Sequence, residues 1–214
     1  MHKKPLMVNV DDPRVFALCT ELLEKGGVIL YPTDTVYGLG ADATNAEAVA
    51  KIKRIKGRSD AKSFLVMLPS VSALEVYGEV NSTARTLAKK FLPGPLGLVL
   101  QSKGGLLASV ESERGTVGFR VPNNSFCLTL GEFFKKPIVS TSANISGQIQ
   151  PKSIKKILEQ LGGRAEDVDV CVDAGVSTSD TPSTIVEVCD NKIIVLREGA
   201  IPKKAFASSG ILFI

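Results

Sequence analysis

The feature that most constrains the fold is the alternation, along all 214 residues, of short apolar runs with longer amphipathic segments. Apolar runs bounded by turn residues are typical of buried strands, and apolar residues that repeat every three or four positions are typical of helices. The expected strands are 28–31, 64–68, 96–101, 116–121, 137–141, 168–173, 183–188 and 192–198. The expected helices are 11–25, 45–57, 81–92, 125–136 and 152–162. This alternation predicts an α/β fold with one large, twisted, mixed sheet flanked by helices.

No internal repeat, low-complexity segment or interdomain linker interrupts this pattern. We therefore expect one domain over residues 1–201 and a C-terminal tail over 202–214. The segment PTDTVYGLGAD (32–42) is rich in Gly, Thr and Asp, and it is expected as a long ordered loop. The first residues lack the apolar core of a signal peptide, and no apolar run is long enough to span a membrane, so we expect neither.

Cysteine and histidine usage argues against several kinds of site. The four cysteines form no CxxC pair and lie in apolar stretches, so we expect reduced, buried thiols in a cytoplasmic protein. The single histidine, His2, lies at the terminus. Histidine acid–base catalysis, a Ser–His triad and a histidine metal site are therefore not expected. The formal net charge of +4 allows an anionic ligand without requiring nucleic acid.

A basic run, KRIKGRSDAK, occupies residues 53–62 and carries five positive charges. Lys56 ends the expected helix, whereas Arg58 and Lys62 lie beyond Gly57. A charge run of this kind is most often a solvated helix face. Its place at a helix end, directly before a strand, also allows side chains to converge on a cleft. The run alone leaves both interpretations open.

A polar run, STSANISG at residues 140–147, follows an expected strand and crowds hydroxyls and an amide into one turn. Such donors suit phosphate or carboxylate oxygens, and ligands of open α/β sheets collect outside strand ends. An ordinary turn with local caps is an equally good interpretation of this run by itself. Walker and GxGxxG loops are absent from the chain, so neither standard nucleotide loop is expected.

Two arginines, Arg120 in TVGFRV and Arg197 in IIVLRE, interrupt apolar strand patterns. A buried arginine is costly unless it is paired or reaches a ligand, and its planar fork fits a carboxylate. An internal salt bridge is the alternative for both residues. Thr33, Asp34 and Thr35 follow the strand that ends at Tyr31, and they either face the same cleft or form a capped turn.

These runs occur in the order PTDTVYGLG, Lys56-Gly57-Arg58, PGPLGLVL, VGFRVP, STSANISG, PSTIVEV and LREGAI. In this order they resemble the YrdC-like family, the threonylcarbamoyl-AMP synthases, from about residue 15 to about residue 201. The resemblance implies the family's single-domain form, with a concave basic cleft on the sheet. It implies a nucleotidyltransferase that condenses L-threonine, bicarbonate or CO2, and ATP to threonylcarbamoyl-AMP and pyrophosphate. The product serves formation of N6-threonylcarbamoyladenosine at position 37 of tRNA.

Carried onto this chain, the resemblance implies that ATP is bound by Lys56, Arg58, Lys62, Thr116, Asn144, Lys152 and Arg197. Lys152 is included because it stands where many members carry a hydroxyl. The resemblance implies that threonine is bound by Thr35, Met67, Arg120, Ser142 and Ser183. Lys56 and Arg58 are expected to be catalytic, because cations stabilise the charge that builds on phosphoryl oxygens. Replacing either one is expected to leave folding nearly intact and to remove most activity.

Mg²⁺ is expected with ATP, held by the nucleotide and water, without a dedicated protein metal site. The expected partners are ATP, L-threonine, bicarbonate and a tRNA threonylcarbamoyl transferase that receives the product. Direct contact with tRNA or RNA stays open. One alternative is an RNA-binding module on a concave basic sheet, which three tyrosines and no tryptophan disfavour. Another is a paralogue with a different carbamoyl substrate.

Overall fold

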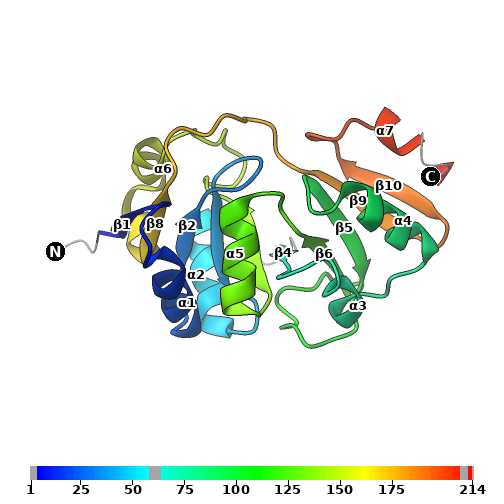
Figure 1. Cartoon of the computed structure of the whole chain (residues 1–214), viewed down its shortest axis with the longest axis horizontal. Coiled ribbons are helices and arrows are strands. Elements are labelled where there is room, and N and C mark those ends of the chain that lie inside the picture. The colour runs from blue at the N-terminus through cyan, green and yellow to red at the C-terminus, as the bar shows by residue number, and fades with distance from the viewer. Residues whose placement is uncertain (1–3, 58–63, 208–211, 214) are drawn as a thin grey trace.

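One mixed sheet runs through the molecule, and helices cover both of its faces (Figure 1). The computed structural model describes residues 4–57, 64–207 and 212–213. Within these residues the strand order is β1-β8-β2-β3-β7-β4-β6-β5-β9-β10-β11. The strands are β1 (Leu6–Asn9), β2 (Ile29–Tyr31), β3 (Gly38–Asp42), β4 (Leu65–Met67), β5 (Leu96–Gln101), β6 (Thr116–Arg120), β7 (Ile138–Ser142), β8 (Val170–Asp173), β9 (Thr184–Cys189), β10 (Lys192–Arg197) and β11 (Leu212–Phe213). Because β4 pairs in parallel with β6 and antiparallel with β7, the predicted mixed sheet is confirmed.

The helices form two layers, one on each face of the sheet. They are α1 (Val15–Glu24), α2 (Ala46–Lys56), α3 (Leu74–Tyr77), α4 (Ser82–Phe91), α5 (Ser125–Phe134), α6 (Ile154–Leu161), the 3-10 turn η1 (Gly162–Asp167) and α7 (Lys204–Ala207). Helices α1 and α5 pack with Ile29 and Tyr31, whereas α2, α4 and α6 belong to the core that contains Leu30. This division follows from the geometry of β2, because successive side chains of a strand point to opposite faces of the sheet.

Helix α2 begins and ends where its sequence predicts. The side chain of Asn45 accepts hydrogen bonds from the N–H groups of Glu47 and Ala48, which caps the first turn. Gly57 ends the helix with a φ of 58°, a left-handed conformation that glycine adopts readily. Lys56 is therefore placed in the last helical turn.

The segment expected as a long loop contains a strand. Residues Gly38–Asp42 form β3, which pairs antiparallel with β2 and with β7. Glycine usually weakens a strand, and for that reason the sequence pattern indicated a loop here. In the structure a Cβ at Gly40 would lie 2.8 Å from Cε1 of Tyr31, and one at Gly38 would lie 3.2 Å from Cζ. The two glycines leave room for the Tyr31 ring, so the loop prediction was wrong over this stretch.

Regular secondary structure is also present near both ends of the described chain. Strand β1 pairs in parallel with β8, although Leu6 and Met7 are exposed and give no readable alternation. After residue 201, where a tail is predicted, α7 places Phe206 in the core with its ring centroid 5.2 Å from that of Phe91. This part of the predicted tail therefore packs against the domain.

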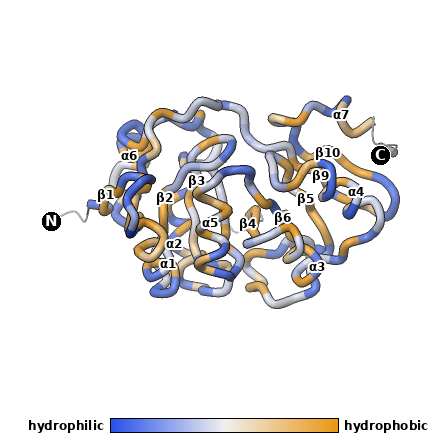
Figure 2. Tube along the Cα trace, viewed as in Figure 1, coloured by the Kyte–Doolittle hydropathy of each residue, from blue (hydrophilic) through white to orange (hydrophobic). Residues whose placement is uncertain are grey.

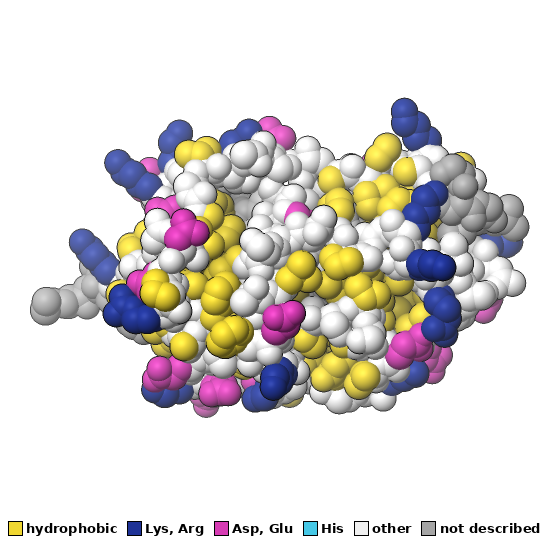
Figure 3. All heavy atoms as spheres, viewed as in Figure 1, with side chains coloured by type: hydrophobic (Ala, Val, Ile, Leu, Met, Phe, Trp, Pro, Cys, Tyr) yellow, Lys and Arg dark blue, Asp and Glu magenta, His cyan; other side chains and the backbone are white. Residues whose placement is uncertain are grey.

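Apolar residues recur along the strands and the helices, as the hydropathy colouring shows (Figure 2), and many of them are buried. On the face drawn in Figure 3, most Lys and Arg side chains gather toward the edges of the molecule. No helix in the described part of the chain is long and apolar enough to cross a membrane.

Candidate active site

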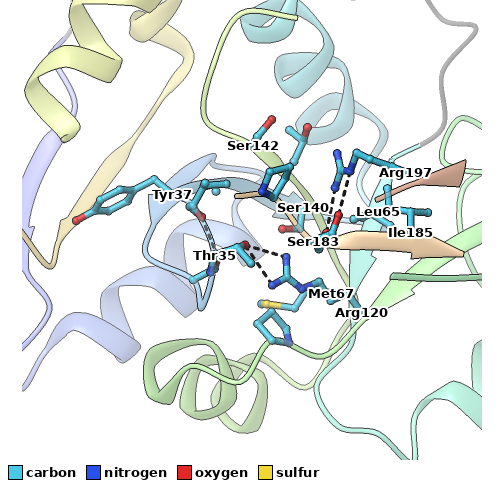
Figure 4. A pocket seen from close by; sticks show the side chains of 16 residues that line it. Thr35, Tyr37, Leu65, Met67, Arg120, Ser140, Ser142, Ser183, Ile185 and Arg197 are labelled. Atoms are coloured by element: carbon cyan, nitrogen blue, oxygen red, sulfur yellow. Dashed lines mark hydrogen bonds between the residues drawn. The ribbon is translucent and has the colours of Figure 1, made fainter. Parts of the chain in front are cut away.

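A small cavity opens where the loop after β2 meets β4, β6, β7, β9 and β10 (Figure 4). Its volume is about 140 Å³, which suits a ligand of amino-acid size. It is lined by Thr33, Thr35, Val36, Tyr37, Gly38, Leu65, Met67, Arg120, Pro122, Ser140, Thr141, Ser142, Pro182, Ser183, Ile185 and Arg197. Two of these described lining residues, Arg120 and Arg197, are charged, and both carry guanidinium groups of a kind that can bind an anion.

All five residues predicted to bind threonine line this one cavity, although they come from distant segments. They are Thr35, Met67, Arg120, Ser142 and Ser183. Strand register accounts for part of this arrangement, because Met67 lies opposite Arg120 in the ladder of β4 and β6. The fold therefore brings the five predicted residues together, and their contact with threonine stays a prediction.

Arg120 lies in the cavity wall and is paired inside the protein. Its Nη2 is 2.5 Å from Oδ1 of Asp34, so the internal salt bridge left open by the sequence is present. Nη1 and Nη2 are each 3.2 Å from Oγ1 of Thr35, and Nε donates to the carbonyl oxygen of Gly94. A guanidinium has five N–H donors. These contacts leave one Nη1 N–H without an acceptor in the described part of the chain, and that donor is available to a ligand.

Arg197 reaches the same cavity from the end of β10. Its Nε and Nη2 are each 3.0 Å from an acceptor on Ser183, the carbonyl oxygen and Oγ respectively. Burial, and then the charge of nearby Arg120, hold the pKa of Arg197 below its usual value. No carboxylate within the described residues forms a salt bridge with Arg197. An anionic ligand would offset both the burial of this guanidinium and its repulsion by Arg120.

Lys56 joins the last turn of α2 to the STSANISG segment. Its Nζ donates to the carbonyl oxygen of Ser142 and to Oδ1 of Asn144, both at 2.6 Å, and the side chain is 3% exposed. Ser142 Oγ also donates to Oδ1 of Asn144, at 2.7 Å. This burial argues against the expectation that replacing Lys56 leaves folding nearly intact, because the change would remove a buried side chain and its two hydrogen bonds. The predicted contact of Lys56 and Asn144 with ATP stays a prediction.

Of the other described residues predicted to bind ATP, Arg197 lines the cavity, whereas Thr116 and Lys152 do not. Thr116 starts β6 and lines a second hollow. Lys152 lies at the surface, where its Nζ is 3.2 Å from Oδ2 of Asp180. Arg58 and Lys62 lie outside the described residues. These assignments, including catalysis by Arg58, stay predictions.

Thr116 nevertheless points to the same face of the sheet as Arg120, since residues four apart on a strand share a face. The two residues are separated by about 13 Å along β6. Between them, a Cβ on Gly118 would lie 2.6 Å from Cδ2 of Leu65. Gly118 thus allows Leu65 to lie across β6, and a ligand that extends from the cavity toward Thr116 would pass over this apolar side chain.

Reasoning from the sequence missed Tyr31, Leu65 and Ile185. Leu65 and Ile185 line the cavity, and Tyr31 lies directly behind it with its hydroxyl 2.6 Å from Oγ of Ser140. A signal for Tyr31 was present in the GLG spacing of β3, because two glycines on one strand face leave room for a large side chain. No local signal distinguishes Leu65 and Ile185 from ordinary core residues.

A protein-borne metal site finds no support in the described residues, where no three His, Cys, Asp or Glu side chains form a group able to hold a metal ion. A Mg²⁺ ion that arrives with a nucleotide needs no such cage, since phosphate and water oxygens can fill its coordination shell.

Comparison with known proteins identifies close relatives over most of the chain. A protein of Methanocaldococcus jannaschii named as a putative threonylcarbamoyl-AMP synthase is 35% identical over 191 residues, which cover 87% of this chain and 88% of that protein. The threonylcarbamoyl-AMP synthase of Bacillus subtilis is 35% identical over 92% of this chain, which spans 56% of that longer protein. An uncharacterized protein of Escherichia coli, YciO, is 32% identical and is covered over 97% of its length.

Solved structures of two such proteins share this fold. The Sua5 protein of P. abyssi, solved in complex with L-threonine, matches the whole chain with a TM-score of 0.87 and 28% identity, and this chain covers 63% of it. E. coli YciO matches 95% of this chain and is itself covered over 99%, with a TM-score of 0.85 and 29% identity. The family model Sua5/YciO/YrdC, described as "Telomere recombination", matches residues 21–199. This chain therefore belongs to the Sua5/YciO/YrdC family.

Proposed function

We propose that this protein is an L-threonylcarbamoyladenylate synthase, which condenses L-threonine, bicarbonate or CO2, and ATP to threonylcarbamoyl-AMP and pyrophosphate. The observation that carries this proposal is the convergence of Thr35, Met67, Arg120, Ser142 and Ser183 on one small cavity. The names of relatives with 35% identity and the threonine complex of a structural neighbour give the same reaction class.

In this proposal the free donor of Arg120 binds the carboxylate of the amino acid. The neutral amine forms a C–N bond with CO2 and releases a proton to solvent, which gives a carbamate whose oxygen attacks the α-phosphorus of ATP. A new P–O bond forms, and pyrophosphate leaves with the electron pair of the bond that breaks. The attacking group is already an anion, so this step needs no strong general base. Positioning and cationic stabilisation dominate such a step.

The nucleotide is proposed to extend from the cavity across Leu65 toward Thr116, with Arg197 at the cavity end. Lys56, Arg58, Lys62, Asn144 and Lys152 are kept as proposed ATP residues on the strength of the family resemblance. ATP is proposed to enter as its Mg²⁺ complex, and its metal would be held by phosphate and water oxygens. The concave basic cleft is likewise a proposal, supported by two arginines among the described lining residues.

The product is proposed to pass to a tRNA threonylcarbamoyl transferase, which uses it to form N6-threonylcarbamoyladenosine. The proposed location is the cytoplasm, where the four free cysteines would stay reduced. Direct contact with tRNA is testable through salt, because binding to phosphates weakens steeply as salt rises. Threonine-dependent turnover should show no comparable dependence.

The test is pyrophosphate release from ATP and bicarbonate in the presence and absence of L-threonine. We expect release that requires threonine and is weaker with serine, which lacks the methyl group. YciO relatives carry no assigned activity, so the same assay should include a panel of other amino acids and carbamoyl phosphate. Release with another substrate and not with threonine would show that this chain is a paralogue with a different reaction.

A further inference from the structure

Tyr31 places a buried phenol directly against the cavity wall. Its side chain is 0% exposed, and its hydroxyl oxygen is 2.6 Å from Oγ of Ser140 and 3.9 Å from Sδ of Met67. Ser140 and Met67 both line the cavity, whereas Tyr31 does not. The phenol therefore touches two lining residues from behind and cannot itself reach a ligand.

Either hydroxyl of the Tyr31–Ser140 pair can donate, and the chemistry of the two groups favours the phenol as the donor. A phenol is the stronger donor and an aliphatic hydroxyl the better acceptor, while the thioether of Met67 is a weak and distant acceptor. Burial raises the pKa of Tyr31 above its usual value, so the phenol keeps its proton at neutral pH. The inferred arrangement has Tyr31 as the donor and Ser140 Oγ as the acceptor.

This direction leaves the hydroxyl proton of Ser140 free. Its Oγ has no other hydrogen-bond partner among the residues that the structure describes. A hydroxyl that accepts from behind and lines a cavity has one donor left for a ligand.

We propose that Tyr31 is a positioning residue that orients the Ser140 hydroxyl toward an acceptor oxygen of the bound amino acid. This role rests on the proposed threonine site and adds two residues, Tyr31 and Ser140, to those predicted for it.

The fold holds Tyr31 rigidly in this role. Its ring lies against Gly38 and Gly40, where added Cβ atoms would come within 3.2 and 2.8 Å of ring carbons. On the helical side the ring of Phe126 lies 6.1 Å away between centroids. A ring fixed on both sides cannot swing away, so its hydroxyl holds Ser140 in one orientation.

The test is a double-mutant cycle with Tyr31→Phe, Ser140→Ala and both changes together. Tyr31→Phe keeps the ring and its packing and removes the hydroxyl alone. We expect each single change to raise the KM for threonine by about two- to tenfold, with kcat and the KM for ATP little changed. In the Ser140→Ala background, Tyr31→Phe should have no further effect on KM, because Tyr31 acts through Ser140.

The matched control is Tyr77→Phe, the same chemical change at a partly buried tyrosine of α3 away from the cavity. It should leave the KM for threonine unchanged. Independent, additive effects of the two cycle variants, or a Tyr31→Phe protein that melts earlier at an unchanged KM, would overturn the positioning role and leave the proposed function standing. Absence of threonine-dependent turnover in the wild-type protein would overturn both the positioning role and the proposed function. The wild-type assay therefore distinguishes failure of the proposed function from failure of the positioning role alone.

Discussion

The ammonium group of Lys56 lies 2.6 Å from Oδ1 of Asn144, a residue 88 positions further along the chain. This contact joins the basic run to the polar run, the two motifs that the sequence alone left ambiguous. It makes Lys56 a buried link between α2 and β7, in addition to the role in ATP binding that the family resemblance implies.

Replacing Lys56 should therefore weaken the fold. Lys56→Met keeps an unbranched apolar stem and removes the ammonium, so the hydrogen bonds to the carbonyl oxygen of Ser142 and to Oδ1 of Asn144 are lost. We expect the free energy of unfolding to fall by about 1–3 kcal/mol, measured by urea denaturation. Lys155→Met, on the exposed face of α6, is the control and should leave the urea midpoint unchanged. Equal midpoints for both variants would contradict the structural role of Lys56.

Arg120→Lys tests whether threonine binding depends on the shape of the guanidinium group or only on its positive charge. One ammonium cannot bridge Asp34, Thr35, Gly94 and a ligand carboxylate, although it keeps the positive charge. We expect the KM for threonine to rise by about tenfold or more, since hydrogen bonds to charged groups are the stronger ones. Arg85→Lys, at an exposed pair with Glu75, is the matched control and should behave like the wild type. An unchanged KM for threonine in Arg120→Lys would contradict the proposed contact between Arg120 and the threonine carboxylate.

The variant Gly40→Ala tests whether the Tyr31 ring packs tightly against β3. The added methyl group would lie 2.8 Å from Cε1 of Tyr31 and 3.0 Å from Cγ2 of Ile138, so the ring must shift. We expect a lower melting temperature together with a higher threonine KM, because Tyr31 contacts the cavity wall. At Gly163 an added Cβ meets nothing within 4 Å, and Gly163→Ala should therefore change neither quantity. Wild-type behaviour of Gly40→Ala would show that the ring has room.

The cysteines give a prediction about pH. Burial raises the pKa of Cys19 and of Cys171 to about 12, so both stay protonated and unreactive at pH values where a free thiol ionises. Of the four free cysteines only Cys189 is partly exposed, and a thiol reagent at about pH 8 should label this one in the folded protein. Burial, and then Glu187, raise its pKa too, so its labelling rate should keep rising above pH 8.

Unfolding in denaturant should expose all four thiols to the same reagent, and Cys189→Ser should remove the labelling of the folded state. Rapid labelling of Cys19 or Cys171 in the folded protein would contradict the buried core described here.

Local patterns predicted most of the fold. The apolar stripe of α4 and the caps of α2 are signals that lie within a few residues of one another, so the sequence suffices to locate them. Strand β3 was not predicted, because its glycines make room for Tyr31, a side chain on a neighbouring strand that no local pattern connects with them. Strand β1 was not predicted, because its side chains show no regular alternation of buried and exposed positions.

The candidate site was predictable as a set of residues and not as a set of contacts. The ordered motifs selected five of the residues that line the cavity, but no local pattern indicates that Asp34 pairs with Arg120 or that Lys56 is buried. Both contacts join residues more than eighty positions apart, and only the three-dimensional fold brings such residues together.

The most direct test of the proposed reaction is the mass of its product. The protein is incubated with ATP, Mg²⁺, L-threonine and ¹³C-bicarbonate, and the adenylates are analysed by mass spectrometry. We predict an adenylate that contains both threonine and one ¹³C carbon, and that is absent when threonine is omitted. A mixture that consumes no ATP, or that yields an adenylate without the labelled carbon, would contradict the proposed synthesis of threonylcarbamoyl-AMP.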